Sequence, residues 1–181
     1  FLKMTFENTK LKGVYIINNF NAIDNRGLFV KTFNKELFKH NNLDFEIRES
    51  YYSSSKKDVI RGMHFQMPPN DHEKLVYVAS GEIIDVVIDL RKKSNTYKEY
   101  ITVKLTADNK KSIFIPKGLA HGFKSLKDDT ITVYNVASEF KSKSDFGIKY
   151  NSFDFDWEIL NPIVSLRDRS LPNLDNFNSP F

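Results

Sequence analysis

The chain has 181 residues, of which 40% are hydrophobic, 28% charged and 14% aromatic, as expected for one folded domain with a substantial core. This composition excludes disorder and collagen, and the absence of cysteine excludes disulfides, thiolate metal sites and cysteine nucleophiles. Lys and Arg exceed Asp and Glu by 27 to 23, and the net charge of +4 is scattered along the chain. We therefore expect an anionic small ligand and no nucleic-acid partner.

No stretch of the sequence predicts a membrane span, because the longest apolar run, 83–90, contains Asp85 and Asp89. The first six residues lack the apolar core and the small-residue cleavage site of a signal peptide. We therefore expect a cytoplasmic protein with no membrane partner, and a single domain over residues 1–181.

In chain order, the pattern of apolar residues and turn signals predicts many short strands and one helix. Strands are predicted at residues 14–18, 28–33, 46–53, 75–79, 82–90, 100–105, 112–115 and 130–137. The runs 75–79 and 82–90 are separated by Ser80 and Gly81, which is typical of a β-hairpin. A helix of barely two turns is predicted at 34–39, with Asn34 as its N-cap.

The segment after residue 161 contains three prolines and is expected to be irregular, with residues 172–181 mobile. Roughly eight to ten short strands beside a single short helix predict an all-β fold, whether a sandwich, a jelly roll or a barrel. No repeat, linker or low-complexity tract divides the chain.

Four histidines occur, and two of them have unusual sequence surroundings. His64 follows the start of an apolar strand, with Arg61 three residues before it. The two-residue period of a strand places Arg61 and His64 on opposite faces unless a bulge intervenes. His121 follows a turn that contains proline and glycine, whereas His40 and His72 indicate only surface positions.

The spacing Pro-x-Gly-x-x-His that ends at His121 is the second half of the cupin signature, and Gly62-x-His64 with Glu73 loosely resembles the first half. A metal-binding cupin needs a second histidine two residues after the first to complete its shell of nitrogen and oxygen ligands. Gln66, a poor metal ligand, stands there. We therefore expect no metal, because a site built from His64, Glu73 and His121 would be incomplete.

Six segments between residues 24 and 168 together resemble the dTDP-4-dehydrorhamnose 3,5-epimerase family. They read DNRGLF (24–29), IRGMHFQ (60–66), KLV (74–76), GEIIDVVIDLR (81–91), IPKGLAHGF (115–123) and PIVSLRD (162–168). The resemblance implies a cupin-type jelly roll, or double-stranded β-helix, with one or a few short helices, that forms a homodimer and uses no cofactor. It also implies epimerisation at C3, C5 or both of a nucleotide-diphosphate-linked 4-keto-6-deoxy sugar, in bacterial surface polysaccharide synthesis.

The same resemblance implies four catalytic residues. His64 corresponds to the base that removes a proton beside the C4 ketone, and Asp168 to the carboxylate that orients its imidazole. Tyr134 corresponds to the proton donor on the opposite face of the sugar, and Lys74 to the cation beside the developing enolate oxygen. Without the resemblance, these residues would be interpreted as a core histidine, part of a solvated charge cluster, a packing aromatic and a surface lysine.

Further positions correspond to substrate-binding residues of the family. Arg26, Arg61 and His121 are expected to bind the diphosphate and neighbouring oxygens, since guanidinium binds two phosphate oxygens at once. An N-terminal strand that crosses to the partner subunit would place Arg26 or Phe29 in the partner's site.

Four positions near the expected nucleotide base depart from the family pattern. Lys31 replaces a glutamate, Glu49 and Tyr51 replace a glutamine and an asparagine, and Phe140 replaces a tyrosine. A carboxylate such as Glu49 accepts two hydrogen bonds from the guanine edge, a role that thymine uses less well. Both dTDP-4-keto-6-deoxyglucose and a GDP-4-keto-6-deoxy-heptose of capsule or lipopolysaccharide synthesis are therefore candidate substrates.

Two other classes of protein fit parts of the sequence. A cupin that moves the ketone between C3 and C4 of a dTDP-sugar tends to carry additional histidines after the Arg-Gly-x-His motif, where Phe65 and Gln66 stand. A sugar-binding β-sandwich without enzymatic activity needs no set of His64, Asp168 and Tyr134, and a wide separation of these three side chains would favour it.

Overall fold

The computed structural model describes residues 3–181. Phe1 and Leu2, the first two residues of the predicted 1–181 domain, lie outside the described residues. The described residues form thirteen strands, two short α-helices and one 3-10 helix. In chain order these are β1 (Thr5–Asn8), β2 (Tyr15–Asn18), β3 (Phe20–Asp24), β4 (Gly27–Lys31), α1 (Lys35–His40), β5 (Glu49–Ser55), β6 (Ile60–Gln66), β7 (Lys74–Ser80), β8 (Glu82–Asp89), β9 (Tyr100–Thr106), β10 (Lys111–Ile115), β11 (Leu119–Ser125), β12 (Thr130–Val136), β13 (Asp145–Gly147), α2 (Leu166–Ser170) and η1 (Leu174–Asn176).

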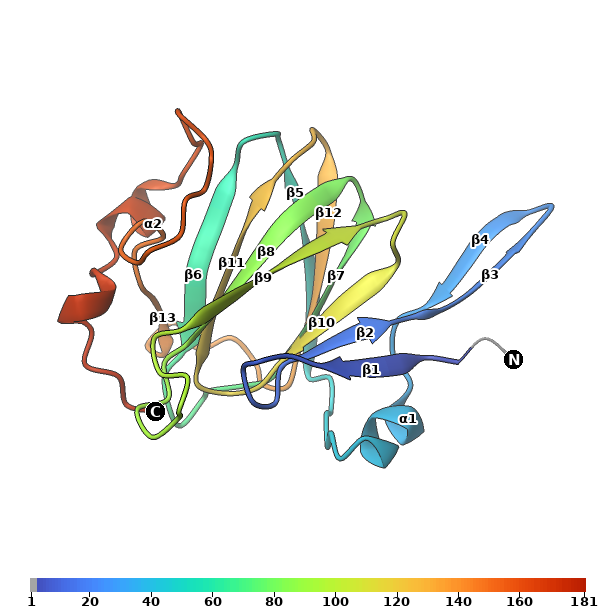
Figure 1. Ribbon diagram of the computed structural model, residues 1–181, viewed down its shortest axis with the longest axis horizontal. Coiled ribbons are helices and arrows are strands. Elements are labelled where there is room, and N and C mark those ends of the chain that lie inside the picture. The colour runs from blue at the N-terminus through green and yellow to red at the C-terminus, as the bar shows by residue number, and fades with distance from the viewer. Residues whose placement is uncertain (1–2) are drawn as a thin grey trace.

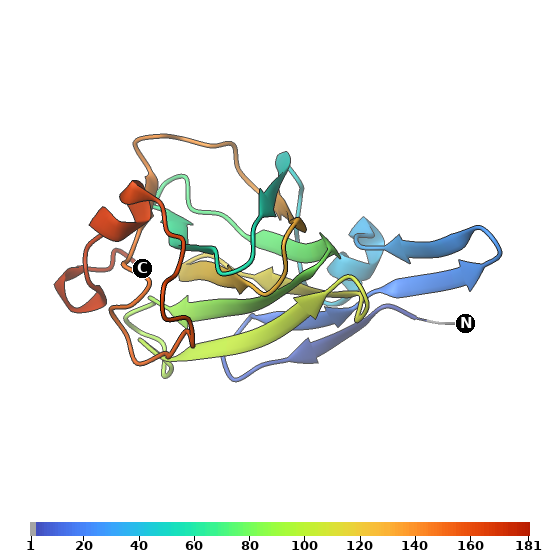
Figure 2. The same cartoon turned by 90° about the horizontal axis from the view of Figure 1, so that it is seen from above.

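Two antiparallel sheets form the body of the molecule and pack face to face (Figures 1 and 2). One sheet has the strand order β1-β2-β10-β7-β12-β5 and the other has the order β13-β6-β11-β8-β9. The main core lies between them, where Val76 and Val78 of β7 pack with Ile83 and Val87 of β8. Strands β5 to β8, and again β9 to β13, alternate between the two sheets, and the prediction of an all-β, cupin-type jelly roll is confirmed.

The strands on either side of Gly81 do not form the predicted hairpin. β7 pairs with β10 and β12, whereas β8 pairs with β11 and β9. Gly81 has a φ of +82°, which glycine adopts without steric cost, and it lies against Thr130, whose Cα would be 2.9 Å from an added Cβ. The chain therefore passes here from one sheet to the other. The hairpin prediction is wrong because a turn between two apolar runs does not show whether they share a sheet.

The predicted helix and its cap are confirmed in α1, where the side chain of Asn34 accepts a hydrogen bond of 3.0 Å from the N–H of Leu37. The strands of the described residues outnumber the expected eight to ten. The additional strands include β1 and β13, which are too short to show an alternating pattern.

The chain after β13 packs against the outer face of the five-stranded sheet (Figures 1 and 2). Trp157, Val164 and Leu174 form a second apolar cluster with Ile60 and Met63 of β6. This packing positions α2, and therefore Asp168, close to β6.

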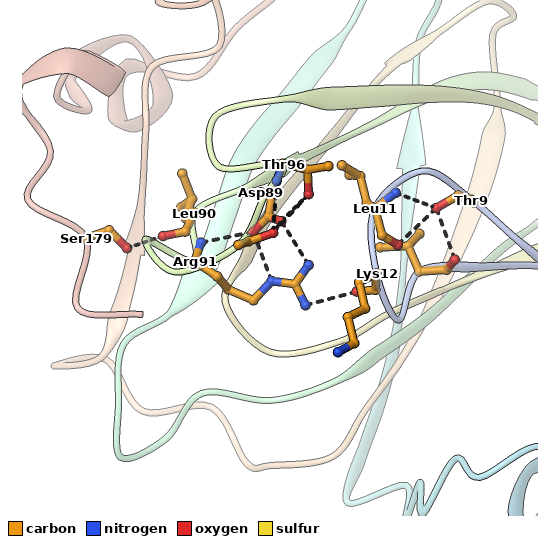
Figure 3. A network of polar contacts seen from close by, with 10 residues as sticks. Thr9, Leu11, Lys12, Asp89, Leu90, Arg91, Thr96 and Ser179 are labelled. Atoms are coloured by element: carbon orange, nitrogen blue, oxygen red, sulfur yellow. Dashed lines mark hydrogen bonds and ion pairs between the residues drawn. The ribbon is translucent and has the colours of Figure 1, made fainter.

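The last residues, 172–181, for which the sequence indicates mobility, are tied to the loop after β8. Ser179 donates a hydrogen bond of 2.5 Å to the carbonyl oxygen of Leu90, beside a network centred on the buried carboxylate of Asp89 (Figure 3). Arg91 binds both oxygens of that carboxylate at 2.9 Å and donates to the carbonyl oxygen of Lys12, also at 2.9 Å. The network therefore links the first loop of the chain with the loop after β8, which holds the C-terminal segment.

β3 and β4 form a separate two-stranded sheet that projects from the body of the molecule (Figure 1). Its apolar side chains are exposed: Ile23 has 73% of its surface accessible, Leu28 50% and Phe29 57%. Among residues 3–181, no helix is long and apolar enough to span a membrane.

Candidate active site

A cavity of about 400 Å³ opens between the two sheets. It contains most of the residues that the sequence singled out. Its walls come mainly from β5, β7 and β12 of one sheet and from β6 and β11 of the other. The lining residues are Glu49, Tyr51, Ser53, Arg61, His64, Phe65, Gln66, His72, Lys74, His121, Tyr134, Val136, Phe140 and Asp145.

A bulge in β6 brings Arg61 and His64 to the same cavity. The pairing of β6 with β11 shifts register between His121 and Phe123, so that residues 62–63 stand opposite a single residue of β11. An extra residue in one strand reverses the alternation of its side chains beyond that point. Arg61 and His64, which a regular strand would place on opposite faces, therefore both line the cavity.

Asp168 lies behind His64 and fixes its ring. Its Oδ1 is 2.7 Å from Nε2 of His64, and its Oδ2 accepts a hydrogen bond of 3.1 Å from the N–H of Gly62. Ser165, the N-cap of α2, holds the backbone of Asp168 through a further bond of 3.1 Å. Burial works to raise the pKa of Asp168, but the bonds from His64 and Gly62 outweigh it and lower the pKa, so the group stays a carboxylate.

His64 is held as a neutral base. Burial lowers its pKa, and the nearby charges of Lys74 and Arg167 act in the same direction, against the opposing effect of Asp168. Because the carboxylate of Asp168 only accepts hydrogen bonds, Nε2 of His64 carries the proton and Nδ1 carries the lone pair. An unprotonated Nδ1 beside the cavity can take a proton from a bound ligand.

Lys74 and Tyr134 face the same cavity from neighbouring strands. The ammonium of Lys74 lies 3.2 Å from the carbonyl oxygen of His64, and burial lowers its pKa to about 8. The hydroxyl of Tyr134 is 3.1 Å from Oγ of Ser53, and the ring stacks on Tyr51 at 4.9 Å. Burial raises the pKa of Tyr134 above its usual range, so the phenol stays protonated and can act as an acid.

His121 belongs to a second histidine–aspartate pair, which the sequence analysis did not find. Its Nε2 is 2.7 Å from Oδ2 of Asp85, a fully buried residue of β8. Burial raises the pKa of Asp85, while His121 and Lys74 oppose the shift. The other carboxylate oxygen, Oδ1, is buried with no hydrogen-bond partner in the described part of the chain. Asp85 lies in the quoted segment 81–91, but the sequence showed it only as an interruption of an apolar strand and not as the partner of His121.

His72 contradicts the prediction of a surface position, because it lines the cavity. Its Nδ1 lies 2.7 Å from Oγ of Ser138, and burial lowers its pKa to about 3, so that the ring stays neutral. The polar neighbours Asp71 and Glu73 concealed this burial in the sequence.

Arg167 and Asp145 were also missed. The guanidinium of Arg167 binds Oδ2 of Asp145 at 2.7 Å and approaches Nε2 of His64 at 3.2 Å. Arg167 thus connects α2 to β13 at the edge of the site. The motif at 162–168 contains both residues, but the resemblance assigned a role only to the neighbouring Asp168.

Three of the predicted substrate-binding residues are absent from the cavity walls. Arg26, Phe29 and Lys31 lie on or beside the projecting β3–β4 sheet, where Arg26 pairs with Asp24 at 2.6 Å. Among the described residues, no group of three or more histidine and carboxylate side chains is arranged to hold a metal ion, and Glu73 does not line the cavity with His64.

A jelly roll whose internal cavity joins a histidine–aspartate pair with a protonated tyrosine and a buried lysine defines a cupin-fold protein suited to proton transfer. The comparisons specify this class further. The chain belongs to the dTDP-4-dehydrorhamnose 3,5-epimerase family, whose sequence model matches residues 8–176. The predictions of this family and of an isomerase are therefore confirmed.

Several relatives are similar to the chain over nearly their whole lengths. The dTDP-4-dehydrorhamnose 3,5-epimerase of Methanothermobacter thermautotrophicus is 39% identical over 170 residues, which cover 91% of each chain. The Escherichia coli K12 protein of the same name is 35% identical over 92% of each chain. A crystal structure of the Bacillus anthracis enzyme, with TDP and PPi bound, superposes with a TM-score of 0.91 at 34% identity, covering 95% of this chain and 100% of the other.

Proposed function

We propose that this chain inverts C3, C5 or both of a nucleotide-diphosphate-linked 4-keto-6-deoxy sugar by removing and returning a proton through an enolate. The observation that carries the proposal is the convergence of His64 and Tyr134 on one cavity, with Asp168 bonded to His64 and Lys74 beside it. A sugar-binding protein without activity needs no such convergence.

The first step uses the neutral ring of His64. A ketone at C4 acidifies the protons on C3 and C5, and Nδ1 of His64 takes one of them. The electron pair of the broken C–H bond moves to the ketone oxygen, forming an enolate. The ammonium of Lys74 stabilises the negative oxygen, and the carboxylate of Asp168 stabilises the imidazolium.

The second step returns a proton to the opposite face of the same carbon. The phenol of Tyr134 donates it, the enolate collapses to the ketone, and the carbon emerges with inverted configuration. The enzyme is left with an imidazolium and a phenolate. The imidazolium of His64 then releases a proton to water, and the phenolate of Tyr134 takes one up, which restores the starting state. The reaction therefore consumes no oxidant, reductant or cofactor.

The thymidine nucleotide is the better supported of the two candidates. A Legionella pneumophila structure with a TM-score of 0.92, 29% identical over 97% of this chain and 95% of the other, is described as a complex with dTDP-4-keto-L-rhamnose. In this chain, Oε2 of Glu49 accepts a hydrogen bond of 2.6 Å from the N–H of Phe140. Because the Legionella relative binds a dTDP-sugar, we favour dTDP-4-keto-6-deoxyglucose over a GDP-heptose.

We also propose that the active form is a homodimer in the cytoplasm of the cell. The β3–β4 sheet projects from the body and exposes the apolar side chains of Ile23, Leu28 and Phe29. An exposed apolar extension of this kind is typical of a segment that packs against another copy of the chain. Such an arm would bring Arg26 or Phe29 towards the cavity of the partner subunit, as the resemblance implies.

The proposal is tested by proton NMR in D2O with the purified protein. One sample receives dTDP-4-keto-6-deoxyglucose and a second receives a GDP-4-keto-6-deoxy-heptose, and the C3 and C5 signals are followed. We expect loss of one or both signals with the dTDP-sugar and formation of an epimer. Exchange only with the GDP-sugar would reassign the nucleotide, and silence in both samples would refute the proposed reaction.

A further inference from the structure

Two loops meet at one rim of the active-site cavity. Residues 67–73 follow β6, and residues 137–144 follow β12. Gln66, the last residue of β6, lies between them with only 5% of its surface exposed, and it lines the cavity. The sequence indicated no function for Gln66 beyond its place in the 60–66 motif, and the proposed reaction gives it no role.

The side-chain amide of Gln66 contacts both loops. Its Nε2 lies 2.9 Å from the carbonyl oxygen of Asn70 in the first loop and 3.0 Å from Oγ of Ser138 in the second. Its Oε1 accepts a hydrogen bond of 2.8 Å from the N–H of Lys141. An amide offers two N–H donors and one acceptor oxygen, so these three bonds use both kinds of group. One buried side chain therefore cross-links the two loops.

His72 extends the cross-link. Its Nδ1 lies 2.7 Å from Oγ of Ser138, and that hydroxyl donates a hydrogen bond of 3.1 Å to the carbonyl oxygen of Asn70. The far end of the second loop is held separately, where Ser144 accepts a hydrogen bond of 2.7 Å from the N–H of Met67. Loss of Gln66 would therefore remove its bonds to Ser138 and Lys141, loosening residues 138–141 and leaving the rest of the loop in place.

The segment that Gln66 holds carries Phe140 at the rim of the cavity. The Phe140 side chain is 58% exposed, so packing does little to fix it. Its position depends on the backbone, whose N–H donates to Glu49 while the next N–H, of Lys141, donates to Gln66. An aromatic face held at the mouth of the cavity provides a surface on which a nucleobase can stack.

We propose that Gln66 is a positioning residue that fixes the 138–141 segment, and with it Phe140, for the nucleotide portion of the substrate. The inference rests on the proposed function, which supplies the nucleotide. Gln66 acts on binding and leaves the proton transfers at His64 and Tyr134 unchanged.

The test compares wild type with Gln66→Leu, which keeps the approximate volume and removes every hydrogen bond. We expect the Kd for dTDP, measured by calorimetry, and the KM for the sugar nucleotide both to rise about tenfold, with kcat unchanged within about twofold. The milder variant Ser138→Ala, at a partly exposed position, should raise both constants about threefold. A fall in kcat at constant Kd in either variant would overturn the inference.

A double variant at Gln66 and Phe140 distinguishes a positioning role of Gln66 from a general loss of stability. Phe140→Ala should weaken dTDP binding, and adding Gln66→Leu to it should cause no further loss, because both changes disable the same contact. Additive losses would contradict the inference. Asn19→Leu is the matched control, since Asn19 is another buried amide, bonded to Ser112 at 2.6 Å in β10, and its loss should leave the Kd unchanged.

Failure of the proposed function is distinguishable from failure of this inference. If wild type binds dTDP without epimerising the sugar, the reaction is refuted, and the ratio of Kd values still decides the role of Gln66. If it binds GDP in place of dTDP, the same ratios are measured with GDP. If it binds neither nucleotide, both proposals are overturned.

Discussion

The contact between His64 and Asp168 decides the chemistry at the scale of single residues. The two residues are 104 positions apart in the chain, and a bond of 2.7 Å joins them. Asp168 is buried and receives a second hydrogen bond from the backbone of β6. This geometry makes the ring of His64 a base with a defined tautomer. A substitution of Asp168 that preserves its shape but removes its negative charge should therefore affect catalysis far more than substrate binding.

Asp168→Asn should lower kcat/KM by about 10² to 10⁴, because the amide can no longer stabilise the imidazolium that forms when His64 takes a proton. The Kd for dTDP should stay within about twofold of wild type. Steady-state kinetics and calorimetry measure the two effects. Asp175→Asn is the control, since Asp175 is an exposed carboxylate paired with Lys98 and away from the cavity. An equal loss in the control, or none in Asp168→Asn, would contradict the assignment.

The pH dependence of kcat/KM should be bell-shaped. His64 works unprotonated and its pKa is lowered from 6.5, so activity should fall only as the pH drops below about 6.5. Lys74 works as an ammonium and its pKa is about 8, so activity should fall again as the pH rises through that value. Lys74→Arg should remove the alkaline fall, because guanidinium stays charged. Activity that rises steadily through pH 9 in wild type would contradict both roles.

At the scale of elements, irregular points in the strands position the site. The bulge in β6 rotates Arg61 and His64 to the same side, and the turn at Gly81 sends β7 and β8 into different sheets. Lys74 at the start of β7 and Asp85 in β8 therefore come from opposite sheets, and the charge of each affects the pKa of the other. Regular strands would separate these groups.

Gly81→Ala should destabilise the fold by more than about 3 kcal/mol, since a Cβ would both strain the backbone at φ +82° and collide with the backbone of Thr130. Gly13→Ala is a close match, with φ +85° and its nearest contact a proline side-chain carbon at 3.2 Å. It should cost about 1–2 kcal/mol from strain alone. Urea unfolding followed by circular dichroism measures the difference, and equal losses would show that the collision with Thr130 is relieved.

Prediction from sequence succeeded where the signal was local. Most of the longer strands, α1 with its Asn34 cap, and the surroundings of His64 are legible within a few residues, whereas the short β1 and β13 are not. It failed for the pairing of β7 and β8, because sheet membership depends on distant partners. Asp85 and His72 were missed for a similar reason: their burial is created by strands remote in sequence, and no neighbouring residue reports it.

At the scale of the whole molecule, the projecting β3–β4 sheet is the feature that the isolated chain leaves unexplained. Exposing Ile23 and Phe29 on a thin arm is unfavourable in water, so we expect another copy to cover them. The residues of this arm that the resemblance assigns to the substrate would then complete the cavity of the partner subunit.

Ile23→Glu with Phe29→Glu should convert the dimer to a monomer, because two charges cannot be buried in an apolar contact, and should raise KM by at least about tenfold. Multi-angle light scattering after gel filtration gives the mass, and kinetics give KM. Leu160→Glu is the control, since Leu160 is 94% exposed and lies in the C-terminal segment. A wild-type protein of 21.1 kDa in solution would refute the dimer directly.

Deuterium exchange by His64→Ala decides whether His64 is the group that removes the proton. The variant is incubated in D2O with the sugar nucleotide that wild type accepts, and the C3 and C5 proton signals are followed while the Kd for the nucleotide is measured on the same preparation. We expect exchange to fall below detection and the Kd to stay within about threefold of wild type. Exchange at the wild-type rate would contradict the assignment of His64 as the base.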